Sequence, residues 1–74
     1  MQIPLETGPD IRALRRSRRI SLNRMAVMLG VPTEGLRAIE RGTLPAHAQT
    51  LEKARVILAK IDNKRSRRVR DAAL

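Results

Sequence analysis

The chain has 74 residues, with 16 Lys and Arg against 7 Asp and Glu, a net charge of +9, and neither Cys nor aromatic residues. A chain of this length holds one small domain, and without Cys no disulfide can stabilise it. We expect a soluble, cytoplasmic protein, because no apolar run nears the roughly 18 residues of a membrane span and the start MQIPLETGPD lacks the features of a signal peptide.

The basic surplus favours a polyanionic partner, because the planar arginine fork can bind two phosphate oxygens at once. The absence of aromatic rings, on which unpaired bases usually stack, favours duplex over single-stranded nucleic acid. A surface that is basic only for solubility is the alternative.

Helical periodicity runs through almost the whole chain and predicts an all-α fold, a compact bundle of four to five short helices. A first helix is expected from Asp10, as its N-cap, to about Arg19, with Ile11 and Leu14 on its inner face. Cations are favoured at its C-terminal end by the helix dipole. Four arginines gather there: Arg15, Arg16, Arg18 and Arg19.

Two further short helices are expected between residues 21 and 42. Ser21 can cap one of about nine residues, which Gly30 ends with a positive φ. Pro32 can open the next, since its missing N–H is not needed in a first turn, and Gly42 ends it.

A fourth helix is expected from about Ala46 to near Asp62. Its apolar stripe consists of Leu51, Ala54, Leu58 and Ile61. The chain then divides into an N-terminal arm (1–9), a helical domain (10–62) and a basic C-terminal tail (63–74).

The basic tail NKRSRRVRDAAL has three possible roles. It could be solvated and disordered, or it could extend the last helix so that Val69 and Leu74 help to pair two subunits. Our hypothesis is that it contacts the DNA backbone or the adjacent minor groove.

The spacing of the second and third helices predicts a helix-turn-helix. Ala26 is small and lies four residues before Gly30, so a neighbouring helix can approach closely before the chain turns. Apolar contacts would hold the two helices at a steep angle through Met25, Leu29, Val31, Leu36 and Ile39. In such a motif the second of the two helices is held out to enter a major groove.

The run IRALRRSRRISLNRMAVMLGVPTEGLRAIERG, with the later TLEKARVIL, resembles the Cro/CI-type (XRE) helix-turn-helix family over residues 10–62. Three motifs carry the resemblance together: LRR in the first helix, AVMLGV at the turn, and IERG closing the third helix. The resemblance implies a transcriptional regulator that binds double-stranded DNA as a homodimer. It also implies an ion pair between Arg15 and Glu40, for which two unrelated surface charges are the alternative.

The resemblance further implies DNA contacts, residue by residue. Base edges would be met by the first turns of the third helix, at Thr33, Glu34, Arg37 and Ala38. Phosphates would be met by the start of the second helix and the loop after the third, at Ser21, Asn23, Arg24, Arg41 and Thr43. The sequence departs from the family pattern at Leu22, where many relatives have Gln, and at Ala38, where a long polar side chain is common.

The acidic Glu34 at the tip of the third helix has two compatible explanations. A carboxylate in a first helical turn interacts favourably with the free N–H groups, by about 0.3–1 kcal/mol. It could also accept a hydrogen bond from the N4 amino group of cytosine in the major groove.

Enzymatic, metal and cofactor chemistry are not expected. His47 is the only histidine and has no Cys or carboxylate pair beside it, so it is predicted to be a loop residue. No serine has a positioned base, and no Gly-rich phosphate loop follows a strand.

The alternative function is a protein-interaction module on a helix-turn-helix scaffold, such as an antitoxin or antiactivator that docks a partner protein. Three residues favour it: Leu22, Gly35 and Ala38. Three others favour DNA: Arg24, Arg37 and Arg41.

Overall fold

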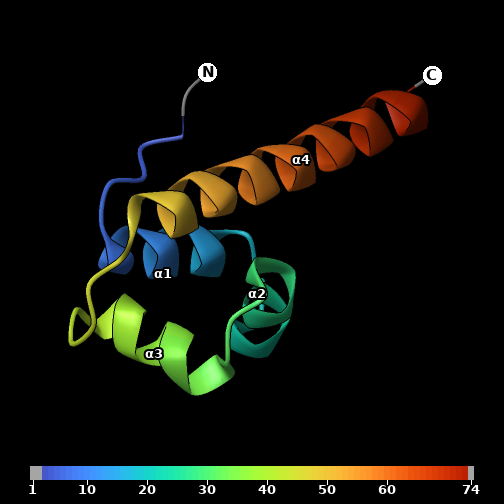
Figure 1. Cartoon of the computed structure of the whole chain (residues 1–74). Helices are drawn as coiled ribbons and strands as arrows, with labels where there is room; N and C mark the ends of the chain where they lie inside the picture. The colour runs from blue at the N-terminus through green and yellow to red at the C-terminus, as the bar shows by residue number, and fades with distance from the viewer. Residues whose placement is uncertain (1–2, 74) are drawn as a thin grey trace.

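The computed structural model describes the backbone of residues 3–73 and the side chains of residues 3–65. Four helices follow one another: α1 (Gly8–Ser17), α2 (Leu22–Leu29), α3 (Thr33–Arg41) and α4 (Ala48–Ala73). No strand occurs between residues 3 and 73. In Figure 1, α1 lies beside α4, while α2 and α3 close the other side of the body. The predicted all-α bundle is therefore confirmed, although α4, with 26 residues, is not short.

The start of α1 is set by Thr7 rather than by Asp10, so the predicted N-cap was wrong. The Thr7 hydroxyl accepts a hydrogen bond from the Asp10 N–H at 3.4 Å. The Asp10 carboxylate accepts the N–H groups of Glu6 and Thr7, each at 3.0 Å. This reciprocal arrangement is a capping box. The backbone bonds from Glu6 and then Thr7 hold the pKa of Asp10 below its ordinary value.

The end of α1 also differs from the prediction, because the helix stops at Ser17 rather than near Arg19. Arg19 has a φ of 58°, in the left-handed region that L-residues rarely adopt, so no helix can continue through it. The chain thereby turns sharply between α1 and α2.

Together α2, the turn at residues 30–32, and α3 form the predicted helix-turn-helix. The Ser21 hydroxyl caps α2 by accepting the Arg24 N–H at 3.1 Å. Gly30 ends α2 with a φ of 74°, Pro32 is the N-cap of α3, and Gly42 ends α3 with a φ of 83°. Both glycines adopt a backbone conformation in which a Cβ would be strained.

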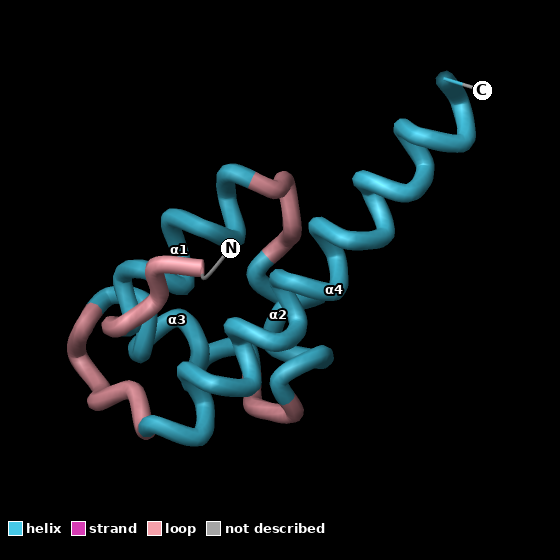
Figure 2. The backbone as a smooth tube through the Cα atoms, turned by 90° about the horizontal axis from the view of Figure 1, so that it is seen from above, coloured by secondary structure: helices cyan, strands magenta, loops and turns pink. Residues whose placement is uncertain are grey.

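The predicted end of the last helix near Asp62 was wrong, because α4 begins at Ala48 and continues to Ala73. Neither Gly nor Pro interrupts this stretch, so no residue in it breaks a helix. Figure 2 shows the C-terminal half of α4 extending beyond the other helices. Up to Ala73 the predicted tail is thus helical. The following tail side chains lie outside the described residues: Arg67, Arg68, Val69, Arg70 and Leu74.

A bidentate ion pair ties α4 to the end of α1. Arg18 Nε and Nη2 donate to the two Asp62 carboxylate oxygens at 2.8 and 2.7 Å. This hydrogen bonding from Arg18 holds the pKa of Asp62 below its ordinary value. Arg65, one turn further along α4, donates to the Arg18 carbonyl at 2.7 Å.

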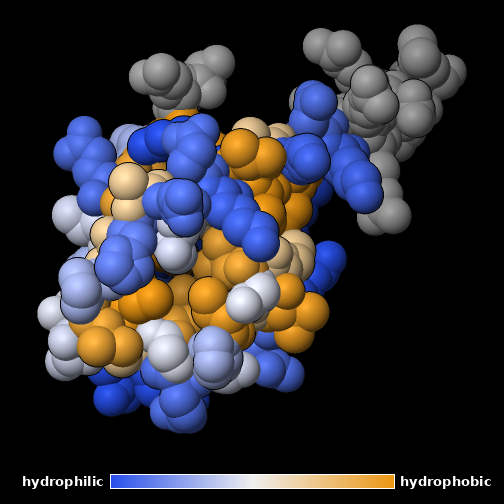
Figure 3. All heavy atoms as spheres, viewed as in Figure 1, coloured by the Kyte–Doolittle hydropathy of each residue, from blue (hydrophilic) through white to orange (hydrophobic). Residues whose placement is uncertain are grey.

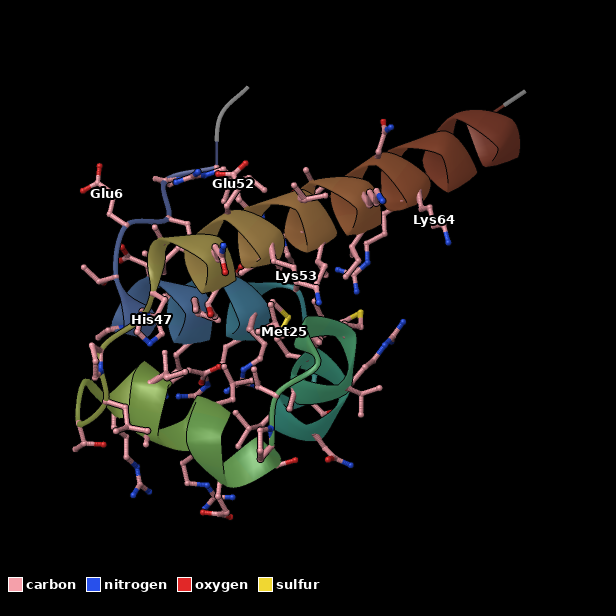
Figure 4. The ribbon with its side chains drawn as sticks, in the orientation of Figure 1. Glu6, Met25, His47, Glu52, Lys53 and Lys64 are labelled. Atoms are coloured by element: carbon pink, nitrogen blue, oxygen red, sulfur yellow. The ribbon has the colours of Figure 1, made fainter. Side chains whose placement is uncertain are left out.

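The core lies where the four helices meet the segment before α1. Its largest fully buried side chains are Leu5, Ile11, Met25, Leu36 and Leu58. Figure 4 shows Met25 pointing from α2 into this interior. Leu5 belongs to the predicted N-terminal arm, yet it is wholly buried and its carbonyl accepts a hydrogen bond from Arg55. Residues 3–7 therefore pack on the body.

Lys53 of α4 points toward the end of α2 in Figure 4. Its ammonium group donates to the Leu29 carbonyl at 3.1 Å. A cation at this position satisfies one of the free carbonyls at the C-terminus of α2 and interacts favourably with the helix dipole. This contact fixes the helix-turn-helix on α4.

A close backbone contact joins α1 to α3. A Cβ built on Gly8 would lie 1.9 Å from the carbonyl oxygen of Ile39. Only glycine allows the first turn of α1 to approach α3 this closely.

None of the helices, over the residues that the structure describes, is both long enough and apolar enough to cross a bilayer.

Candidate nucleic-acid interface

The outer side of α3 is the candidate interface. In Figure 3 hydrophobic side chains cross the middle of the viewed face, and hydrophilic side chains line its lower edge, where α3 runs. The predicted contact residues on α3 and on the start of α2 are described first, followed by the groups that hold α3 on the body.

A side-chain hydrogen bond joins the starts of α2 and α3. The Thr33 hydroxyl donates to the Asn23 amide oxygen at 2.8 Å. Thr33 is the first residue of α3 and is half-buried, whereas Asn23 is exposed. A residue predicted to read a base and one predicted to contact a phosphate are thus bonded to each other, so DNA would have to share or replace this bond.

Glu34 and Arg37 lie one turn apart on α3, with a carboxylate oxygen 3.8 Å from Arg37 Nη2. The two side chains are 82% and 46% exposed, and an ion pair so open to water contributes at most about 1 kcal/mol. Pro32 supplies no side-chain cap for α3, which leaves the first-turn N–H groups available to the Glu34 carboxylate. The helix-dipole explanation of Glu34 is thus compatible with the observed geometry, and base reading stays a prediction.

Two of the predicted phosphate contacts have capping roles in the structure. Ser21 caps α2, and the Thr43 hydroxyl donates to the Ala38 carbonyl at 3.0 Å, at the end of α3. Both residues are exposed. Arg24 and Arg41 are exposed as well, and their guanidinium groups have no hydrogen-bond or ion-pair partner among the side chains and backbone that the structure describes.

Ala38, predicted to face a base, is half-buried. Its carbonyl accepts the N–H groups of Thr43 and Leu44 at 3.0 and 3.2 Å, in addition to the Thr43 hydroxyl. A methyl side chain can contribute only apolar contact to a base edge, such as the methyl group of thymine.

The ion pair between Arg15 and Glu40 is present and mostly buried. Arg15 Nε and Nη2 each lie 2.9 Å from one Glu40 carboxylate oxygen, and Nη1 donates to the Ile20 carbonyl at 2.8 Å. The two side chains are 12% and 3% exposed. One guanidinium therefore ties together α1, the turn before α2, and α3.

A hollow lies at the seam of α1, α2 and α3, beside this ion pair. The side chains around it are those of Arg12, Arg15, Leu22, Arg37, Glu40 and Arg41. The predicted site did not include Arg12, although it lies three residues before Arg15 and so shares a face of α1 with it. That spacing was the available signal. Leu22 packs against the core at the start of α2.

His47 is exposed just before α4 (Figure 4). Within the part of the chain that the structure describes, no three His, Asp or Glu side chains are grouped closely enough to hold a metal ion.

Comparison of the chain with protein-family models, curated proteins and solved structures found no match. The resemblance to the Cro/CI-type family, carried by the sequence motifs, remains a prediction.

Proposed function

We propose that the protein is a transcriptional regulator of Cro/CI type that binds double-stranded DNA sequence-specifically, with α3 in the major groove. The observation that supports this most is the asymmetry of α3. Its inner side is held to α1 by the Arg15–Glu40 ion pair and the contact at Gly8. Its outer side presents Arg37 and Arg41.

The dimensions and charge of this face suit a duplex. A B-form major groove, about 12 Å wide, admits one α-helix. With α3 in the groove, Thr33, Glu34 and Arg37 are available to base edges. Arg24 at the start of α2 and the residues after α3 are available to phosphates on either side.

We also propose that the chain acts as a cytoplasmic homodimer. One unit with a single recognition helix covers only one half-site, and proteins with this motif usually bind two half-sites about one helical turn apart.

A second candidate is a protein-interaction module, as in an antitoxin or antiactivator. The observation that favours it is Val27 on α2, which is 74% exposed. An exposed Val offers nothing to a phosphate, whereas it would add apolar area to a protein interface.

The test is fluorescence anisotropy with a labelled random-sequence duplex at several salt concentrations. DNA binding predicts an affinity that falls steeply with salt, with a slope of about 0.9 for each phosphate neutralised. Arg24→Ala should weaken binding. The matched control is Arg16→Ala, which removes the same charge from an exposed position on α1.

Selection from a random pool then tests specificity. An enriched sequence with two related half-sites supports a dimeric regulator. If binding to the duplex is absent or insensitive to salt, the DNA-binding proposal fails and the protein-interaction module is favoured.

A further inference from the structure

We propose that the hollow between α1, α2 and α3 binds one phosphate group of the DNA backbone through Arg12, Arg37 and Arg41. This inference depends on the proposed function. It adds to the DNA contacts a residue of α1, outside the helix-turn-helix, and directs Arg37 toward the backbone rather than toward a base.

The charges around the hollow are unbalanced in favour of an anion. Four guanidinium groups line it, with a single carboxylate, that of Glu40. Both oxygens of this carboxylate are bound by Arg15, whose third nitrogen donates to a backbone carbonyl. Arg15 and Glu40 therefore neutralise each other, and the charges of Arg12, Arg37 and Arg41 remain.

The remaining positive charges have little compensation within the protein. Arg12 and Arg41 form no ion pair with any described residue. Arg37 has only the exposed Glu34 carboxylate, at 3.8 Å and open to water. Like charges around one hollow repel, and a bound anion would relieve that repulsion.

The chemistry of the lining residues favours a phosphate. Guanidinium groups match the spacing of two phosphate oxygens, and three of them surround one hollow. Leu22 forms an apolar wall, which lowers the local screening by water.

The position of the hollow favours a phosphate of the duplex backbone. Arg37 and Arg41 lie one turn apart on α3, and the hollow adjoins that flank of the helix. A helix placed in the major groove has the two backbones beside its flanks, so one phosphate would come to lie at this seam.

The test compares salt slopes for a labelled random duplex. Arg12→Ala should lower both the affinity and the slope, and the control Arg16→Ala, on the same helix but away from the hollow, should change neither. The double variant Arg12→Ala, Arg41→Ala should lower the slope by about 0.9, the value for one phosphate. Two separate phosphate contacts would lower it by about twice that amount.

A second measurement uses inorganic phosphate as the probe and the arginine Nε–Hε signals in the NMR spectrum of the full chain. The signals of Arg12, Arg37 and Arg41 should shift along one saturating curve, with the signal of Arg16 unchanged. Circular dichroism melts of each variant control for folding.

The outcomes separate the two proposals. If the wild type binds duplex in a salt-dependent way but Arg12→Ala behaves like Arg16→Ala, the phosphate site is refuted and the proposed function stands. If the wild type does not bind duplex while inorganic phosphate saturates the hollow, both the proposed function and the DNA-backbone assignment are refuted.

Discussion

Arg15 and Glu40 meet across the contact between α1 and α3 through two parallel hydrogen bonds, each 2.9 Å long. Because the Glu40 side chain is only 3% exposed, the pair is a structural link rather than a surface interaction. It fixes how α3 is presented, and it is therefore the first target for mutation.

Arg15→Ala should lower the free energy of unfolding by about 3–5 kcal/mol, because it leaves a buried carboxylate without its partner. Arg16→Ala, at an exposed position one residue along, should change it by less than about 0.5 kcal/mol. Urea denaturation followed by circular dichroism measures both. Equal stability of the two variants would contradict a structural role for the pair.

Two glycine substitutions should have opposite effects on the melting temperature. Gly8→Ala should be strongly destabilising, since the new Cβ would lie 1.9 Å from the Ile39 carbonyl oxygen. Gly35→Ala, within α3, should stabilise by about 0.5–1 kcal/mol, because its Cβ would meet nothing closer than Pro32 Cδ at 3.8 Å. Thermal melts of the two variants give the signs directly. A stabilising Gly8→Ala would show that α1 and α3 are not in backbone contact.

Stability should fall on acidification partly through Asp62 and Asp10. The folded protein holds both pKa values below the ordinary 3.8, through hydrogen bonding from Arg18 to Asp62 and from backbone N–H groups to Asp10. Their stabilisation is therefore fully present above the unfolded pKa and is lost as the pH falls through the lower, folded pKa.

Urea midpoints measured between about pH 6 and pH 2 test this pH dependence. The variants Asp62→Asn and Asp10→Asn should each be less stable than wild type at neutral pH. The difference should shrink as the pH falls. A difference from wild type that stays constant over this range would rule out the charged form of that carboxylate as the stabilising species.

Glu34→Ala should change the preferred DNA sequence more than the total affinity, because a carboxylate can contribute to binding only by reading a base, worth about 1–3 kcal/mol of discrimination. Arg37→Ala should instead weaken binding. Selection from a random pool, with anisotropy on the selected sites, distinguishes the two effects. The same selected sequence for wild type and Glu34→Ala would leave only the helix-dipole role for this residue.

Ending the chain after Asn63 removes five basic residues and one acidic residue, which lowers the net charge from +9 to +5. If this segment contacts the DNA backbone, the salt slope should decrease by about 0.9 per phosphate lost, with the preferred sequence unchanged. A second truncation after Arg65 keeps the bond from Arg65 to the Arg18 carbonyl and controls for folding. A truncated chain that becomes monomeric at unchanged slope would make the segment a dimerisation element.

The element boundaries that could be predicted are those with strong local chemistry. Ser21, Gly30 and Gly42 lie at helix ends whose cap or left-handed backbone few other residues satisfy. The start of α1 was ambiguous, because Thr7 and Asp10 are both good caps and take part in one capping box. No residue type signals the positive φ of Arg19.

Other features depend on contacts that spacing along the chain does not reveal. The apolar stripe of the last helix shows where α4 packs on the body, and it stops near Asp62 although the helix does not. Arg18 and Asp62 are 44 residues apart, and only the fold brings them together. The hollow likewise combines Arg12, Leu22 and Arg41 from three helices.

The unbroken course of α4 has a consequence for reach. At 1.5 Å per residue, residues 63–73 carry the chain about 16 Å along a fixed line. A flexible tail would lose entropy whenever it bound, whereas a helix has already lost most of it on folding. The recognition helix and the far end of α4 thus stand at a set separation, like two points of a gauge. A ligand that touches both must have the matching curvature, so the protein would select it by shape as well as by sequence.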